Sequence, residues 1–130
     1  MNWGKRPAGR IAAAAVVAAL TALGALAGCG GAPNQVQMGV ADFQQHSITI
    51  HAGQAVHFVD PGNGGGVHIL CVGHNLKCVP GPGVPPALDT QAGLSFNPGD
   101  PARDVVFATA GTYEVICTIH PGMVLMVTVQ

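Results

Sequence analysis

Hydrophobic and polar residues alternate in short runs along the chain from residue 36 onward. The clearest run is Ser47-Ile48-Thr49-Ile50, where polar residues alternate with β-branched ones. A period of two places neighbouring side chains on opposite faces of a β-strand, and short runs bounded by Gly, Pro, Asn or Asp are typical of strands joined by turns. We therefore predict eight strands, at residues 36–43, 47–50, 55–59, 67–72, 93–96, 104–108, 112–117 and 123–129. Because no helical period occurs in this part of the chain, the pattern favours an all-β sandwich.

One irregular segment, at residues 73–91, interrupts this pattern. It contains Val79-Pro-Gly-Pro-Gly-Val-Pro-Pro86, and proline has no main-chain N–H to donate to a neighbouring strand. We therefore expect an ordered surface loop here rather than a central strand.

The phase of the strand predicted at residues 112–117 indicates which side chains face the core. Cys117 is in phase with Tyr113 and Val115, whereas the charged Glu114 marks the outer face. We therefore expect Cys117 to point inward.

The last strand, at residues 123–129, separates the two C-terminal methionines in the same way. Met123 is in phase with the inward-facing Leu125 and Val127, whereas Met126 is on the opposite face. Met123 is therefore the methionine that we expect beside Cys117, although a buried core residue is the usual role of a methionine.

The N-terminal part of the chain predicts an export signal. Residues 1–10 carry basic side chains and no acidic one, and residues 11–27 are rich in Ala, Val and Leu. This order predicts a secretory signal peptide at residues 1–28, with an N-terminal anchor helix as the alternative. The motif Leu26-Ala27-Gly28-Cys29 resembles the lipobox of bacterial lipoproteins, which implies a lipid on Cys29. The alternative is an ordinary cleaved signal with a free cysteine.

These boundaries divide the chain into a signal peptide at residues 1–28, a lipidated cysteine with a spacer at 29–35, and one β domain at 36–130. Beyond residue 28, two basic side chains, Lys77 and Arg103, stand against six acidic ones, a net charge of −4 with histidine neutral. A weakly charged acidic domain lacks the clustered Lys and Arg that contact phosphates, so we expect no binding to nucleic acid.

The motif Cys117-Thr-Ile-His-Pro-Gly-Met123 brings a thiolate, an imidazole and a thioether into one short loop. A His/Cys set with a weak axial Met is the signature of a blue-copper electron-transfer site, and Cys-x-x-His is a chelating spacing. A buried inert thiol and a catalytic nucleophile are the other roles open to Cys117. No Asp or Asn lies in the loop to orient His120 as a base, so a catalytic cysteine is not favoured.

A second imidazole has to come from elsewhere in the chain, and His68 is the best candidate. It follows a glycine-rich loop and opens an apolar strand, where burying a polar ring without a partner is costly. His74 is the reserve candidate. The remaining histidines, His46, His51 and His57, are expected at the surface.

Two further cysteines, Cys71 and Cys78, remain after Cys29 and Cys117 are assigned. Because an exported pair tends to oxidise, we predict a disulfide between them. The alternative is a second metal site formed with His74.

Two stretches resemble the cupredoxins, the family of small blue type 1 copper proteins that includes amicyanin and plastocyanin. They are Gly111-Thr-Tyr-Glu-Val-Ile-Cys-Thr-Ile-His-Pro-Gly-Met123, similar to the C-terminal copper loop, and Ser47-Ile-Thr-Ile-His-Ala-Gly-Gln-Ala-Val-His-Phe-Val-Asp60, similar to the early hairpin. The resemblance implies an eight-stranded Greek-key β-sandwich. It also implies one copper ion with His68, Cys117 and His120 as equatorial ligands and Met123 as the axial ligand.

We therefore expect a monomeric one-electron carrier, not an enzyme, that cycles between Cu(I) and Cu(II) and docks a redox partner protein near His120. The lipid anchor implies the extracytoplasmic face of a bacterial membrane. A copper-binding module for storage, delivery or sensing is the alternative. An oxidase is not favoured, because Ile116 and Thr118 stand where multicopper oxidases have histidines.

Overall fold

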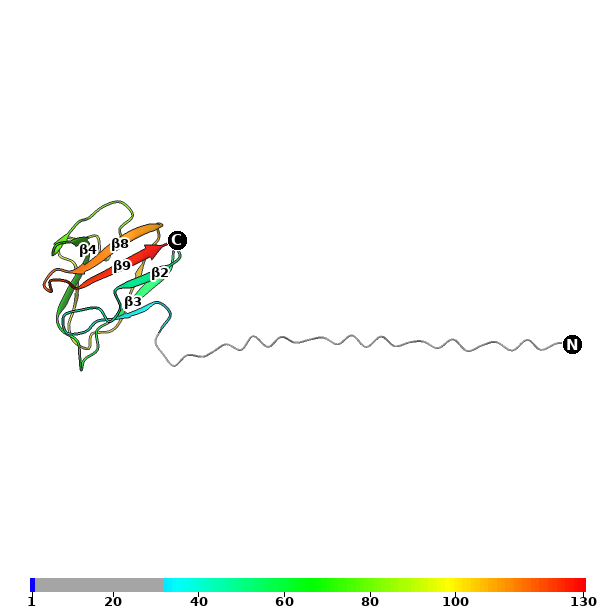
Figure 1. Ribbon diagram of the computed structural model, residues 1–130, viewed down its shortest axis with the longest axis horizontal. Helices are drawn as coiled ribbons and strands as arrows, with labels where there is room; N and C mark the ends of the chain where they lie inside the picture. The colour runs from blue at the N-terminus through cyan, green and yellow to red at the C-terminus, as the bar shows by residue number, and fades with distance from the viewer. Residues whose placement is uncertain (2–31) are drawn as a thin grey trace.

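Two β-sheets pack against each other in the domain (Figure 1). The computed structural model describes Met1 and residues 32–130, so the predicted signal peptide with its helix, and Cys29, lie outside the described residues. Within that part of the chain the strands are β1 (Gln35–Gln37), β2 (Ser47–Ile50), β3 (Ala55–Val59), β4 (His68–His74), β5 (Lys77–Cys78), β6 (Leu94–Phe96), β7 (Arg103–Val106), β8 (Gly111–Cys117) and β9 (Val124–Val129). The predicted all-β sandwich is confirmed.

The smaller sheet has the order β1-β3-β7 and the larger has the order β2-β9-β8-β4-β5, with β6 paired to β4. The β1–β3 and β2–β9 pairs are parallel, and the other pairs are antiparallel. In Figure 1, β8 and β9 lie side by side near the C-terminus. Strands distant in sequence are therefore neighbours, as β4 and β8 are.

The core lies between the sheets and follows the predicted alternation. Val56 and Phe58 of β3 are fully buried, as are Val115 and Cys117 of β8. In β9 the inward residues are buried and Met126 is 37% exposed, as its phase predicts. Period-two alternation therefore correctly identified the buried face of these strands.

The strand predicted at residues 36–43 was wrong in its extent. β1 ends at Gln37, and the chain then turns, with the Gly39 N–H donating to the Asp42 carbonyl at 2.8 Å. Val40, whose phase suggested burial, is 67% exposed on this turn. The alternation of apolar residues continued past Gln37, but a glycine-initiated turn interrupted the strand.

The segment at residues 73–91 forms a loop, as predicted, apart from the short strand β5. Asn75 and Leu76 have φ angles of 50° and 64°, so they form a tight turn between β4 and β5. Among the described residues, no helix is long and apolar enough to cross a membrane.

Candidate metal centre

Three side chains that the sequence analysis singled out converge at one end of the sandwich. One ligand atom each from His68, Cys117 and His120 lie within 4.8 Å of one another. His68 opens β4, Cys117 ends β8, and the pairing of Leu70 with Cys117 fixes the alignment of the two strands. The second imidazole is therefore brought to the Cys117 loop by strand register and not by sequence proximity.

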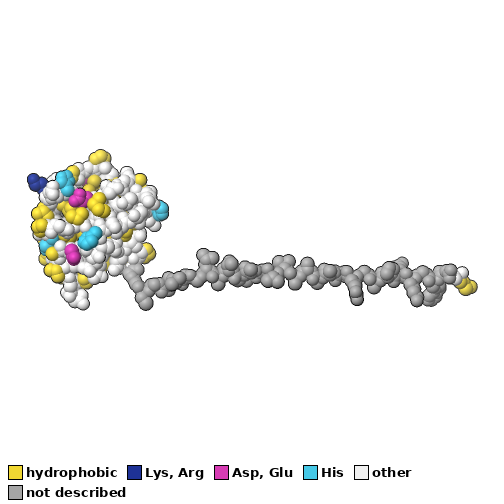
Figure 2. All heavy atoms as spheres, viewed as in Figure 1, with side chains coloured by type: hydrophobic (Ala, Val, Ile, Leu, Met, Phe, Trp, Pro, Cys, Tyr) yellow, Lys and Arg dark blue, Asp and Glu magenta, His cyan; other side chains and the backbone are white. Residues whose placement is uncertain are grey.

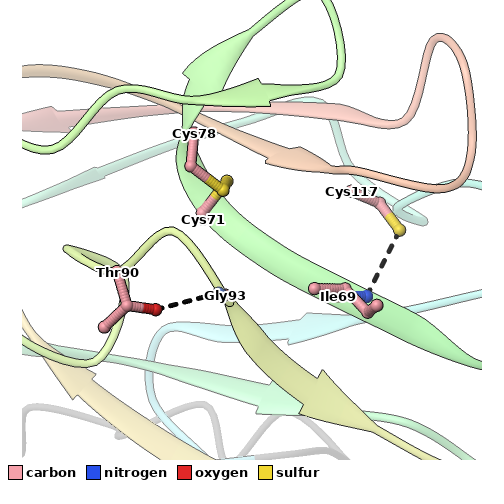
Figure 3. Close-up of a disulfide and its surroundings, with 6 residues drawn as sticks. All are labelled: Ile69, Cys71, Cys78, Thr90, Gly93 and Cys117. Atoms are coloured by element: carbon pink, nitrogen blue, oxygen red, sulfur yellow. Dashed lines mark hydrogen bonds between the residues drawn. A yellow bond between two sulfur atoms is a disulfide. The ribbon is translucent and has the colours of Figure 1, made fainter.

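Cys117 is completely buried and is the free cysteine of the described residues. Its Sγ accepts a hydrogen bond from the Ile69 main-chain N–H at 3.5 Å (Figure 3) and lies 3.5 Å from Nδ1 of His120. A sulfur with one N–H donor and an imidazole nitrogen beside it is placed as a thiolate metal ligand.

His68 is also completely buried, and its two ring nitrogens have different surroundings. Nε2 lies 2.9 Å from the Gly39 carbonyl oxygen, which can only accept a hydrogen bond, so Nε2 carries the proton. Nδ1 is buried and has no hydrogen-bond partner among the described residues. Its lone pair is therefore available to a metal, the arrangement in which an outer carbonyl fixes the tautomer of a histidine ligand.

The electrostatics favour the neutral form of this ring. Burial lowers the pKa of His68 below its ordinary value, and the nearby Asp60 carboxylate and the Gly39 carbonyl only partly oppose that effect. A neutral imidazole is the form that binds metals.

His120 is the more accessible of the two histidines. Its ring centroid lies 5.1 Å from that of His68, and the two planes are inclined at 61°. The ring is partly exposed, so this residue connects the buried cluster to the protein surface.

Met123 ends the same loop and is 1% exposed. Its N–H donates to the His120 carbonyl at 3.2 Å, and its carbonyl accepts the Cys117 N–H at 3.2 Å. The turn between them has Gly122 at a φ of 83°, a conformation that favours glycine. These bonds fold the loop back on itself, so that Met123 is held against the residues that precede it.

The other histidines are not part of the cluster. His74, the reserve candidate, is exposed at the end of β4, and His46 and His51 are exposed as predicted. His57 lies on β3 in the smaller sheet, where its Nδ1 is 2.5 Å from Oδ1 of Asp104. His68 is therefore the histidine that completes the set.

Cys71 and Cys78 form a disulfide, as predicted (Figure 3). The alternative metal site with His74 is excluded, because both sulfur atoms are used in this bond. The disulfide joins β4 to β5 across the tight turn at Asn75 and Leu76.

Sequence reasoning did not identify the groups that surround the ligands. The Gly39 carbonyl and the Ile69 N–H are main-chain atoms, and any residue can supply them, so no sequence signal marks them. Asp60 is also buried beside the cluster, and its acidic side chain after an apolar strand was a signal that we did not use.

The donor set fits copper. It combines a soft sulfur with two imidazoles, one of them with an unpartnered buried nitrogen, and no carboxylate joins the cluster within residues 32–130. The surface shown in Figure 2 carries few charged side chains, in line with the low charge of the sequence.

The comparisons with known proteins agree with this chemistry. The family model described as "Copper binding proteins, plastocyanin/azurin family" matches residues 32–130. A search of curated proteins found no match to the chain.

Solved structures with a similar fold are also copper proteins by their titles. Amicyanin from Paracoccus versutus is 24% identical, with a TM-score of 0.53 over 74% of this chain and 79% of its own. Plastocyanin from Dryopteris crassirhizoma is 24% identical, with a TM-score of 0.52 over 74% of this chain and 99% of its own. A copper-containing nitrite reductase from Thermus scotoductus is 26% identical, with a TM-score of 0.52 over 78% of this chain but only 23% of its own.

Proposed function

The chain belongs to the plastocyanin/azurin family of copper-binding proteins, and from that premise we propose that it is an exported blue-copper protein that carries one electron at a time. Its cofactor is copper, and we propose His68, Cys117, His120 and Met123 as the ligands of a single ion. The observation that carries this proposal is the convergence of the His68, Cys117 and His120 donors within 4.8 Å in a buried site. When bound, copper supplies the Cu(I)/Cu(II) couple.

The protein's part in electron transfer is to keep the ligands fixed while the charge changes. Main-chain bonds from Gly39 and Ile69 hold His68 and Cys117 in place, and strand pairing fixes β4 against β8. A preorganised site needs little rearrangement on gain or loss of an electron. This rigidity supports the carrier role.

The route for the electron is expected to be His120, because it is the one accessible residue of the three. A hollow of about 430 Å³ lies beside it and includes Leu76, Pro121 and Val124 in its lining. Apolar side chains around a polar exit support brief docking of a partner protein here. Since Cys117 is fully buried, direct transfer of the metal to an acceptor is less favoured than transfer of an electron.

The visible spectrum of the chain loaded with Cu(II) tests this proposal. We expect an intense blue colour that disappears on addition of a reductant and returns with an oxidant. Cys117→Ser removes the thiolate and should abolish the colour. A colourless copper-loaded wild type in the presence of oxidant contradicts the proposal.

A second measurement separates the carrier from a module for copper storage, delivery or sensing. A carrier is reduced and reoxidised repeatedly at an electrode and retains its copper. Transfer of the copper to a metal-free acceptor on mixing, without a reversible electrode response, identifies the module instead.

Export and lipid attachment at Cys29 complete the proposal. The Cys71–Cys78 disulfide supports an oxidising compartment, because such bonds are rare in the bacterial cytosol. Cys29→Ser should release the protein from the membrane fraction of a bacterial host, and wild type should gain the mass of acyl chains. Wild type in the soluble fraction without that mass contradicts the anchor.

A further inference from the structure

Asp60 is a buried carboxylate without a partner. Its side chain is 2% exposed, and neither oxygen has a hydrogen-bond donor among the described residues. The residue follows β3 directly, and only its main-chain carbonyl is used, by the Gly99 N–H at 3.1 Å. Burying an ionisable group in this way is costly, so its presence calls for a compensating charge.

The carboxylate lies behind His68, with two glycines between them. A Cβ atom at Gly65 would lie 1.6 Å from Oδ1 of Asp60, so the carboxylate occupies the space of a side chain at that position. The next residue, Gly66, has its main-chain nitrogen 3.4 Å from Nε2 of His68. Asp60 is therefore close to the outer nitrogen of His68, on the side of the ring away from the unpartnered Nδ1.

The charges of the two residues influence each other across this short distance. The carboxylate raises the pKa of His68, and His68 lowers the pKa of Asp60, although burial is the larger effect on each. No Lys or Arg forms an ion pair with Asp60 in residues 32–130. The other nearby acidic group, Asp100, repels it and accepts hydrogen bonds from Asn97.

The charge of the metal centre changes by one unit during the redox cycle. With two neutral imidazoles and the Cys117 thiolate, the centre has a charge of +1 with Cu(II) and is neutral with Cu(I). A fixed negative charge behind His68 attracts the first state and not the second. One electron leaves for an external one-electron acceptor on oxidation, and no bond at Asp60 forms or breaks.

We propose that Asp60 is the internal counter-charge of the oxidised centre and that it biases the bound copper toward Cu(II) through His68. The inference rests on the copper site proposed above. Asp60 does not bind the metal, so it is a positioning residue.

The test is the reduction potential of the copper-loaded full chain, measured by spectroelectrochemical titration in the wild type and in Asp60→Asn. The amide has the shape of the carboxylate without its charge. Removing a unit charge from a buried position near the metal should raise the ratio of Cu(I) to Cu(II) affinity at least about tenfold. For a one-electron couple this is a rise of about 59 mV.

The matched control is Asp42→Asn. Asp42 is exposed on the turn that carries Gly39, so this variant removes the same charge from a position that solvent screens. It should change the affinity ratio less than about twofold. The blue band should keep its position in both variants, because the ligands are unchanged.

An unchanged or lowered potential in Asp60→Asn overturns the inference, as does an equal shift in the control. A shift accompanied by a displaced blue band also overturns it, because the ligands themselves have then moved. If Asp60→Asn does not fold, Asp60→Ser is judged by the same criteria. A wild type without blue colour is a different result, which rejects the proposed function itself.

Discussion

The main-chain N–H of Ile69 donates a hydrogen bond to Sγ of Cys117 at 3.5 Å, across 48 positions of sequence. The bond connects the strand that carries His68 to the residue that supplies the thiolate. Because the donor is a main-chain group, it does not depend on the side chain at position 69. A hydrogen bond to the thiolate withdraws electron density from sulfur and stabilises the ionised form.

Met123 and Met126 offer a direct comparison of a ligand with a surface residue. Met123→Leu removes the thioether from a position that is 1% exposed, whereas Met126→Leu changes a residue that is 37% exposed on the outer face of β9. Because Cu(II) gains more than Cu(I) from a further electron-pair donor, Met123→Leu should raise the reduction potential. Voltammetry of both variants measures this effect, and Met126→Leu should match the wild type.

Gly66 is predicted to be essential for the position of His68. A Cβ atom at Gly66 would lie 2.6 Å from the Val40 carbonyl oxygen, so Gly66→Ala pushes away the turn that holds the Gly39 acceptor. Losing an outer hydrogen bond to a metal ligand typically lowers metal affinity about 10- to 100-fold. Competition with a copper chelator measures that change.

The control for this experiment is in the same loop. A Cβ atom at Gly64 would meet no atom within 4 Å, so Gly64→Ala should leave copper affinity unchanged. Equal losses in the two variants would mean that loop flexibility, and not the contact at Gly66, controls the site.

The disulfide is predicted to stabilise the domain without shaping the metal site. Replacing both Cys71 and Cys78 by Ala opens a loop with a sequence separation of 7, for which the chain-entropy model gives a loss of about 2–3 kcal/mol. The colour of the copper form should persist, since the pairing of Leu70 with Cys117 does not depend on the bridge. Urea unfolding measures the first effect and the visible spectrum the second. A lost or shifted blue band would show that the bridge also holds the ligands.

The copper-free protein should become less stable as the pH falls below the ordinary imidazole value of 6.5. Burial lowers the pKa of His68 in the folded chain, so below pH 6.5 the unfolded chain binds more protons at this residue. The free energy of unfolding therefore rises with pH up to that value and then levels off.

Urea unfolding of the copper-free protein between about pH 5 and about pH 8 measures this dependence. His68→Gln should flatten the profile between those limits, whereas His51→Gln, at an exposed position, should leave it unchanged. A wild-type profile without a slope contradicts the account of a buried neutral ring.

The sequence alone determined the fold class, the loop that carries three of the proposed ligands, and the disulfide. Each of these depends on local spacing: period-two alternation in β3, β8 and β9, the short interval from Cys117 to Met123, and the two cysteines that close one hairpin. Spacing failed at Val40, where the apolar alternation continued but a turn at Gly39 ended β1.

Only the tertiary structure decided which main-chain groups hold His68 and Cys117, and which charge lies behind them. The Gly39 carbonyl, the Ile69 N–H and the Asp60 carboxylate reach the site through the packing of the two sheets and the loops that join them. Main-chain atoms are the same in every residue, so a sequence does not distinguish those that face a metal from those that face solvent. Burial of a carboxylate likewise depends on what covers it, and that is set by contacts between segments far apart in the chain.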